Sequence, residues 1–300
     1  YRGEMPFKNV YFTGIVRDKQ RRKMSKSLGN SPDPIELMKK YGADGVRSGM
    51  LFSAPAGNDL LFDEKLCEQG RNFSNKLWNA FRLIQTLEVS DKGKDQSLAI
   101  SWIKSRYDEI LSEVNDHFSK YRISDALLSL YSFIWDDFCN WYLEIIKDSS
   151  ISEDTYRDTI AILEKILKVL HPFMPFITEE LWNQIDKERG YIMLSDYPKP
   201  NEFDAGLNED FKKVFEMVTG LRKLKSDNKV KQIEVVKIMI NKKSGFDFNS
   251  YKELIEKLSK TKDLEIVKDI PSDYPTIVSG KDTLSLAIEK SEGSKEDTLK

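Results

Sequence analysis

The fold of this chain is set by residues 66–84, which read LCEQGRNFSNKLWNAFRLI. Apolar or small residues recur there at steps of three and four, which places them on one face of an α-helix. These residues are Leu66, Gly70, Phe73, Leu77, Phe81 and Ile84. The same spacing returns in 103–118 and 127–145, and further helices are predicted over 155–170 and from Pro175 onward. Residues 63–190 are therefore predicted to form an antiparallel helical bundle.

The bundle core is predicted to be rich in aromatic side chains. The tryptophans expected in it are Trp102, Trp135, Trp141 and Trp182.

On the amino-terminal side, residues 1–62 are too few for a domain of their own. We predict a strand over 10–16, a helix from Pro34 that ends at Gly42, a helix over 43–52, and a loop over 53–59. The residues expected on the buried side of the first helix are Ile35, Leu37 and Met38. The chain starts at Tyr1 rather than at a methionine, so we read it as a piece of a longer protein in which 1–62 ends a larger domain.

On the carboxyl-terminal side, residues 191–207 contain two prolines, Pro198 and Pro200, and are predicted to be a connector. Residues 208–290 are predicted to be a small α/β unit. Its predicted elements are a helix around Phe211–Leu221, a helix over 251–258, and strands over 233–240, 264–267, 276–278 and 284–288. Residues 291–300 are predicted to be a frayed tail. The fold class is thus mainly α, and the 208–290 unit, which has no motif, is expected to be a packing module.

Composition describes a soluble globular protein of two or three domains. The chain has 300 residues, of which 40% are hydrophobic and 32% are charged, with a formal net charge of −2. No apolar run is long enough to span a membrane, and no signal peptide is visible. Cys67 and Cys139 are far apart and form no CxxC, so we predict neither a metal site nor a disulfide framework. We expect a monomer in the reducing cytoplasm.

The most distinctive short stretch is Lys23-Met24-Ser25-Lys26-Ser27, inside the basic run 17–26. Two lysines three residues apart can close on a polyanion, and the hydroxyls of Ser25 and Ser27 can donate to phosphate oxygens. Met24 is expected to anchor the loop by packing, as is Leu28. The alternative reading is a solvated basic turn.

Together with Leu28-Gly29-Asn30, this stretch resembles the signature loop of the class I aminoacyl-tRNA synthetases. The resemblance implies that the loop binds the triphosphate of ATP, which is expected to carry Mg²⁺. It further implies catalytic roles for Lys23 and Lys26, with Lys26 the more direct ATP ligand, and ATP-binding roles for Ser25 and Ser27. Residues 1–62 would then be the end of a Rossmann-like catalytic domain.

Two further phrases, Gly70–Ala80 and His171–Trp182, resemble the anticodon-binding bundle of the valine, isoleucine and leucine enzymes. Gly70–Ala80 and Met50–Asp59 look most like the valine enzymes of bacteria, and the lack of a CxxC also favours valine over isoleucine. The partners implied are valine, ATP and tRNA(Val). Two alternatives stay open, an isoleucine or leucine enzyme fragment and a non-catalytic tRNA-binding module.

The predicted anticodon residues lie on the first bundle helix. Arg71, Asn75, Asn79 and Arg82 fall at helical spacing and are flanked by Asn72 and Lys76. Arginine and asparagine can bond to the edges of unpaired bases. The alternative is a polar solvated face, or cross-links inside the bundle.

The two histidines do not form the H-x-G-H phrase with which class I enzymes bind the nucleotide. His171 is expected to be structural and His117 exposed. The chain alone is therefore predicted not to form an adenylate.

Overall fold

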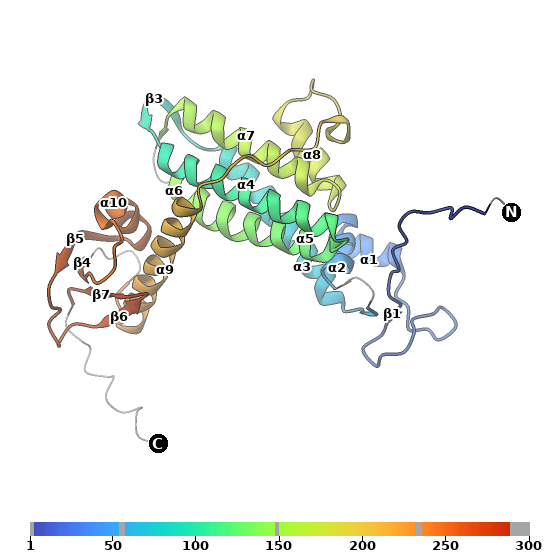
Figure 1. Cartoon of the computed structure of the whole chain (residues 1–300), viewed down its shortest axis with the longest axis horizontal. Helices are drawn as coiled ribbons and strands as arrows, with labels where there is room; N and C mark the ends of the chain where they lie inside the picture. The colour runs from blue at the N-terminus through green and yellow to red at the C-terminus, as the bar shows by residue number, and fades with distance from the viewer. Residues whose placement is uncertain (1–2, 54–57, 148–149, 232–235, 289–300) are drawn as a thin grey trace, which may run out of the picture. The chain divides into compact units, whose positions relative to one another are not determined.

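The computed structural model describes residues 3–53, 58–147, 150–231 and 236–288 (Figure 1). Two compact units are present, Tyr1–Phe203 and Asp204–Lys300, and each is described by itself. The structure is mainly helical, as predicted, with small sheets. The predicted tail 291–300, most of the predicted loop 53–59 and the start of the predicted strand 233–240 lie outside the described residues.

The first two helices have the predicted bounds, α1 (Pro34–Tyr41) and α2 (Ala43–Phe52). Asp33 caps α1 by accepting the N–H of Ile35. The helix ends at Gly42, whose φ of 77° suits glycine. The buried side of α1 was predicted only in part, because Leu37 and Tyr41 are buried whereas Ile35 and Met38 are exposed. In this two-turn helix the i, i+4 pair Leu37 and Tyr41 packs with Cys67 of the helix over Glu64–Gln85.

The predicted strand over 10–16 is wrong for most of its length. Only Val16–Arg17 (β1) is a strand, and it pairs in parallel with Leu60–Leu61 (β2). A strand needs a neighbour for its N–H and C=O groups, and β2 offers one to just two residues. Val10 and Phe12 are exposed.

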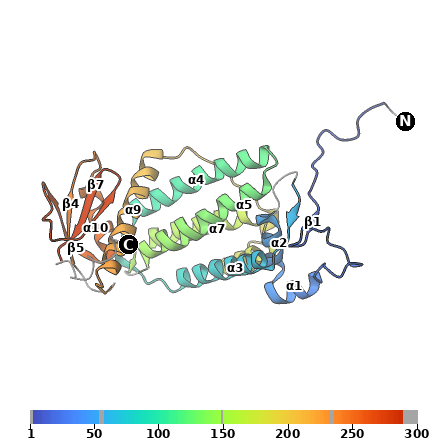
Figure 2. The ribbon, with the colours of Figure 1, turned by 90° about the horizontal axis from the view of Figure 1, so that it is seen from below.

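The helices predicted between residues 63 and 190 are all present, in the unit that also contains α1 and α2. Their bounds are α3 (Glu64–Gln85), α4 (Ser97–Ser119), α5 (Ile123–Ser132), η1 (Phe133–Tyr142), α6 (Leu143–Ile146), α7 (Glu153–Leu170) and α8 (Pro175–Ile185). Helices α4, α5 and α7 lie side by side in both views (Figures 1 and 2). The three residues 120–122 join α4 to α5, so these two helices run antiparallel.

The segment from α5 to α6 is one continuous helix whose middle ten residues, η1, have π-helical bonding. A π turn shifts the helix faces relative to a regular α-helix. Trp135 and Trp141 are only half-buried, whereas Trp102 and Trp182 are buried as predicted. A short strand β3 (Val89–Lys94), which the sequence did not predict, bonds to the backbone around Ile151. The connector contains a single 3-10 turn, η2 (Ile192–Leu194).

The second unit is an α/β arrangement. Its elements are α9 (Ala205–Asp227), β4 (Val236–Asn241), α10 (Phe248–Ser259), β5 (Thr261–Val267), β6 (Thr276–Ser279) and β7 (Asp282–Leu286). The strand order is β5-β4-β7-β6, with β4 and β5 parallel and the other two pairs antiparallel. Helix α9 packs on β6 and β7, and α10 packs on α9 and β5.

Helices α2 and α3 cross at a distance that only glycine allows. A Cβ at Gly49 would lie 2.6 Å from the backbone N of Cys67, and one at Gly70 would lie 2.4 Å from the carbonyl oxygen of Gly45. Both distances are far below van der Waals contact, so a methyl group would force the two backbones apart.

We therefore expect Gly49→Ala to destabilise the first unit by about 1–3 kcal/mol, the usual cost of overpacking. Urea unfolding measures it. The matched control is Gly220→Ala inside α9, where the added Cβ would meet Ile277 at an ordinary 3.5 Å. That change should be neutral or stabilise by up to about 1 kcal/mol, because alanine favours a helix interior. Equal effects of the two changes would contradict the close crossing.

Candidate phosphate-binding loop and nucleic-acid interface

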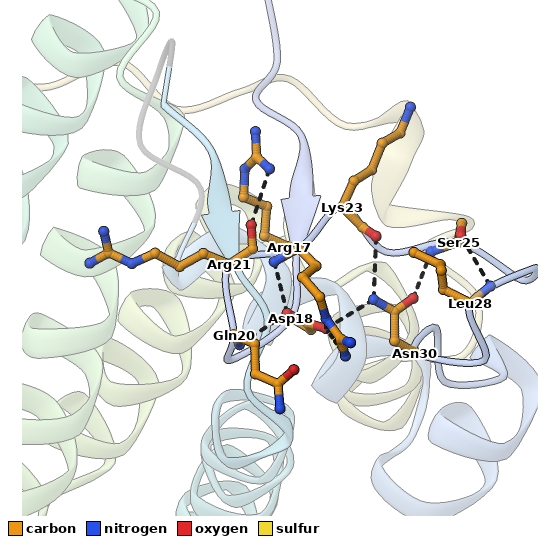
Figure 3. Close-up of polar contacts among 9 residues, drawn as sticks. Arg17, Asp18, Gln20, Arg21, Lys23, Ser25, Leu28 and Asn30 are labelled. Atoms are coloured by element: carbon orange, nitrogen blue, oxygen red, sulfur yellow. Dashed lines mark hydrogen bonds and ion pairs between the residues drawn. The ribbon is translucent and has the colours of Figure 1, made fainter.

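The basic loop is built around the carboxylate of Asp18. It accepts the backbone N–H groups of Gln20 and Arg22, each at 2.9 Å, and the Nδ2 group of Asn30 at 2.9 Å. The guanidinium of Arg22 also pairs with it, at 2.8 Å. One side chain therefore closes the turn at 18–22 and joins it to residue 30 (Figure 3).

Asn30 holds the signature stretch from its other side. Its Oδ1 accepts the N–H of Ser25 at 2.9 Å, and its Nδ2 lies 3.3 Å from the carbonyl oxygen of Lys23. The Oγ of Ser25 accepts the N–H of Leu28 and lies 3.2 Å from the Oγ of Ser27. The side chains of Asp18 and Asn30, together with backbone and hydroxyl groups of the loop, thus set its shape. Among the described residues the side chains of Lys23 and Lys26 have no hydrogen-bond or ion-pair partner.

These contacts lower the pKa of Asp18 to about 2 from its ordinary 3.8. The hydrogen bond from Asn30 is the largest cause of this lowering, and the N–H and guanidinium of Arg22 add to it. A depressed carboxyl pKa means that the bonds stabilise the loop fully above pH 4, and that this stabilisation is lost as the pH falls toward 2.

Lys23 and Lys26 are exposed, and among the described residues neither is in an ion pair. Figure 3 shows Lys23 extending away from the Asp18–Asn30 contacts. Two cations that precede the signature stretch are in ion pairs. Arg17 pairs with Asp59, and Lys19 lies 3.4 Å from Asp63. The two charges of the signature stretch are therefore available to a polyanion.

The expected apolar anchors of the loop behave differently. Met24 is half-buried and lines a hollow of about 390 Å³ that also includes Phe62 and Pro32. Leu28 is 61% exposed, so its expected anchoring role is wrong in this structure. The short turn from Lys26 to Gly29, closed by the 3.1 Å bond between them, directs Leu28 outward.

The predicted tRNA residues on α3 divide into two groups. Asn72, Asn75, Asn79 and Arg82 are exposed and follow one stripe of the helix. Arg71 instead pairs with Glu68 at 3.1 Å and stacks over the ring of Tyr41. Lys76 donates to Oδ1 of Asn140 at 2.7 Å and lies over the ring of Trp135.

The contacts of Lys76 bring η1 next to the stripe. Asp136 and Asn140 are exposed there and joined by a 3.3 Å hydrogen bond. The sequence pattern did not point to Asp136 and Asn140, because a regular α-helical count does not anticipate the π turns that set their direction.

The His171–Trp182 phrase is explained by a junction with α2. Asp44 is 5% exposed and accepts the N–H groups of Ile177 at 2.7 Å and Phe176 at 3.3 Å, at the start of α8. Burial raises the pKa of Asp44. Arg47 donates to the carbonyl oxygens of Phe173 and Pro172, both at 3.2 Å.

The two histidines lie in structural settings. The Nδ1 of His171 is 2.7 Å from the Oγ1 of Thr178, and burial lowers the pKa of the ring. The expected exposure of His117 is wrong, since its side chain is 16% exposed and packs beside Glu113.

Other chemistry finds little support in the described part of the chain. Burial raises the pKa of the Cys139 thiol to about 12 and also raises that of Cys67, which disfavours a thiolate nucleophile. No group of three or more metal-ligating side chains is seen in these residues. None of the described helices is long and apolar enough to cross a membrane.

Two family profiles match the chain. Residues 1–63 match the class I tRNA synthetases (I, L, M and V), and residues 101–240 match the anticodon-binding domain of tRNA ligase. The second match begins after α3, so the predicted stripe on that helix lies outside it.

Two curated relatives carry the same name. The valine–tRNA ligase of Christiangramia forsetii is 53% identical over 238 residues, which cover 77% of this chain and 27% of that protein. The valine–tRNA ligase of Phocaeicola vulgatus is 51% identical over 247 residues, which cover 80% and 28%. The chain belongs to the valine–tRNA ligase family. It spans a little over a quarter of the length of these valine–tRNA ligases.

A solved structure supports the fold. The LeuRS–tRNA–LeuAMS ternary complex of Agrobacterium radiobacter K84 matches 65% of this chain and 25% of that chain, with a TM-score of 0.50 and 20% identity. The likeness concerns the fold alone. The names of the relatives favour valine–tRNA ligase over the isoleucine and leucine alternatives.

We expect a ¹³C titration of the Asp18 carboxyl group to have its midpoint near pH 2 and to move toward 3.8 in Asn30→Ala, because the largest stabilising bond to the carboxylate is removed. Asp59 is the internal control, since its pKa is lowered chiefly by Arg17 and should not move. An unchanged Asp18 midpoint in the variant would show that Asn30 does not hold the loop.

Proposed function

We propose that this chain supplies the triphosphate-binding loop and the anticodon-binding bundle of a valine–tRNA ligase. That enzyme joins valine to ATP, giving valyl-adenylate and pyrophosphate, and then transfers the valyl group to tRNA(Val). In this proposal residues 1–62 end the catalytic domain, 63–190 form the anticodon-binding bundle, and the enzyme is a cytoplasmic monomer. The observation that carries the proposal is the Lys23–Ser27 loop, whose backbone is fixed by Asp18 and Asn30 while both of its lysines stay unpaired.

The chemistry needs charge stabilisation at one place. Attack of the valine carboxylate on the α-phosphate of ATP expels pyrophosphate, and negative charge grows on that leaving group. Lys26, with Lys23, would neutralise this charge, and Mg²⁺ would arrive with ATP as part of the substrate. Preorganised charge is effective because the cation needs no rearrangement at the moment of reaction.

The hydroxyl groups of Ser25 and Ser27 would add directional hydrogen bonds to the phosphate oxygens. The Oγ of Ser25 already accepts the N–H of Leu28, so its own proton is free to be donated either to Ser27 or to a phosphate oxygen. Donation to ATP would hold the loop closed on the triphosphate.

For tRNA, we propose that the α3 stripe of Asn72, Asn75, Asn79 and Arg82 meets the anticodon. These side chains are exposed, and amide and guanidinium groups suit unpaired bases. Arg71 and Lys76 would join after leaving their present partners. The Arg71–Glu68 pair is a surface ion pair worth about 0–1 kcal/mol, so its loss would cost little.

In the complete ligase, we expect Lys26→Ala to reduce ATP–pyrophosphate exchange by about 100- to 1,000-fold, since one preorganised charge is removed from the transition state. The matched control is Lys39→Ala, an exposed lysine of α1 paired with Glu36 at 2.7 Å, which should leave the rate within about twofold.

The same assay tests the role of the isolated chain, which should show no exchange. Wild-type exchange rates in Lys26→Ala, or exchange by the isolated chain, would refute the proposed division of the active site.

For the anticodon, the chain should bind tRNA(Val) more tightly than the same tRNA with its middle anticodon base changed, at one fixed salt concentration. Asn75→Ala combined with Asn79→Ala should reduce this discrimination by about tenfold, because a good base contact is worth about 1–3 kcal/mol. The control is Asn183→Ala on α8, whose side chain bonds to Glu179. Unchanged discrimination in the double variant would place the anticodon reader elsewhere.

A further inference from the structure

The second unit gathers lysines at one edge of its sheet. Strands β4 and β5 are parallel, so their carboxyl ends meet, with Asn241 opposite Val267. The turn between β6 and β7 lies at the same edge, since Thr283 is opposite Asn241 and Ser279 is opposite Asp282. The residues that follow or join these strand ends are Lys242, Lys243, Lys268 and Lys281. We call these four residues the lysine edge.

All four side chains are exposed, and within the described ranges none of them is in an ion pair. The acidic neighbours along the chain are Asp247, Asp269, Asp273 and the buried Asp282. Asp247 accepts from the N–H of Asn249 and the hydroxyl of Ser250 at the start of α10. The edge therefore presents four exposed ammonium groups to solvent, with the carboxylate of Asp282 buried behind them.

The side chains of Asp282 and Asn241 hold the backbone that carries these lysines. Asp282 is 2% exposed, and its carboxylate accepts the N–H groups of Lys243 at 2.7 Å and Ser244 at 2.8 Å, as well as the hydroxyl of Ser244 at 2.5 Å. Asn241 donates its side-chain amide to the carbonyl oxygen of Lys268. Asp282 thus joins the turn between β6 and β7 to the loop after β4, and Asn241 joins the end of β4 to the loop after β5.

A group of cations on a fixed backbone suits a polyanion with a regular charge spacing. Lysine is a point charge without the planar fork with which arginine reads base edges, so it favours phosphate contact over sequence reading. We propose that the lysine edge binds the phosphate backbone of the tRNA, as a second contact independent of the anticodon. This inference rests on the proposed function, and it assigns the 204–288 unit a binding role where the sequence predicted only packing.

The test measures binding of labelled tRNA(Val) to the chain at several salt concentrations. In Lys243→Gln/Lys268→Gln we expect the affinity at low salt to fall about tenfold, and the slope of log K against log salt to decrease by about 1 for each lysine removed. The loss should be equal for the tRNA with a changed anticodon base, because phosphate contacts carry no sequence information.

The matched control is Lys223→Gln/Lys262→Gln in the same unit. Both residues are exposed, and Lys262 lies at the opposite end of β5, opposite Lys237. This variant makes the same change in charge, and it should bind within about twofold of wild type and keep the wild-type salt slope. Urea midpoints equal to wild type would show that both variants are folded.

The outcomes separate this inference from the proposed function. Equal affinity and slope in the two double variants would overturn the lysine edge while leaving the anticodon proposal standing. If the wild-type chain bound the two tRNAs equally, while Lys243→Gln/Lys268→Gln still weakened binding, only the anticodon proposal would be overturned. Loss of binding to phosphatidylserine vesicles in the edge variant, with tRNA binding unchanged, would overturn the tRNA assignment in favour of a lipid surface.

Discussion

The first unit depends on the close crossing of α2 and α3. Because Gly49 and Gly70 let the two backbones approach, α2 is held against the bundle at a fixed depth. From that position Asp44 and Arg47 reach the turn at 172–177 and fix the start of α8. Helix α2, which follows the basic loop, thereby contacts both α3 and α8, the first and the last helices predicted for the bundle. Side-chain hydrophobicity alone would not specify this arrangement, since the contacts that set it are backbone to backbone and carboxylate to N–H.

The basic loop shows a division of labour between shape and charge. Asp18 and Asn30 satisfy backbone groups and hold the turn, while Arg17 and Lys19 balance nearby carboxylates. Within the described residues the side chains of Lys23 and Lys26 make no hydrogen bond or ion pair, so a bound phosphate would have no such contact to disrupt. This arrangement is the one that the proposed triphosphate-binding role requires.

The sequence was sufficient for what depends on periodicity and capping. The start and the end of α1 followed from Pro34 and Gly42, and the bundle helices followed from three- and four-residue spacing. It was insufficient where long-range contacts decide. The strand over 10–16 shrank to two residues because β2, the strand that pairs with it, is two residues long. The π turns of η1 could not be read from residue type. Asp44, Asp282 and Asn140 gave no local signal, because each acts on residues far away in sequence.

The pairing of β1 with β2 has a mechanical consequence. The amide of Leu60 bonds to the carbonyl of Ile15, and the amide of Phe62 bonds to that of Arg17, while Asp63 begins α3 directly afterward. The loop proposed to close on ATP directly follows β1, and the helix proposed to meet the anticodon directly follows β2. Both are therefore attached to the same pair of strands. A ligand that displaced the loop would therefore act on the same stretch of backbone that leads into the first turn of α3.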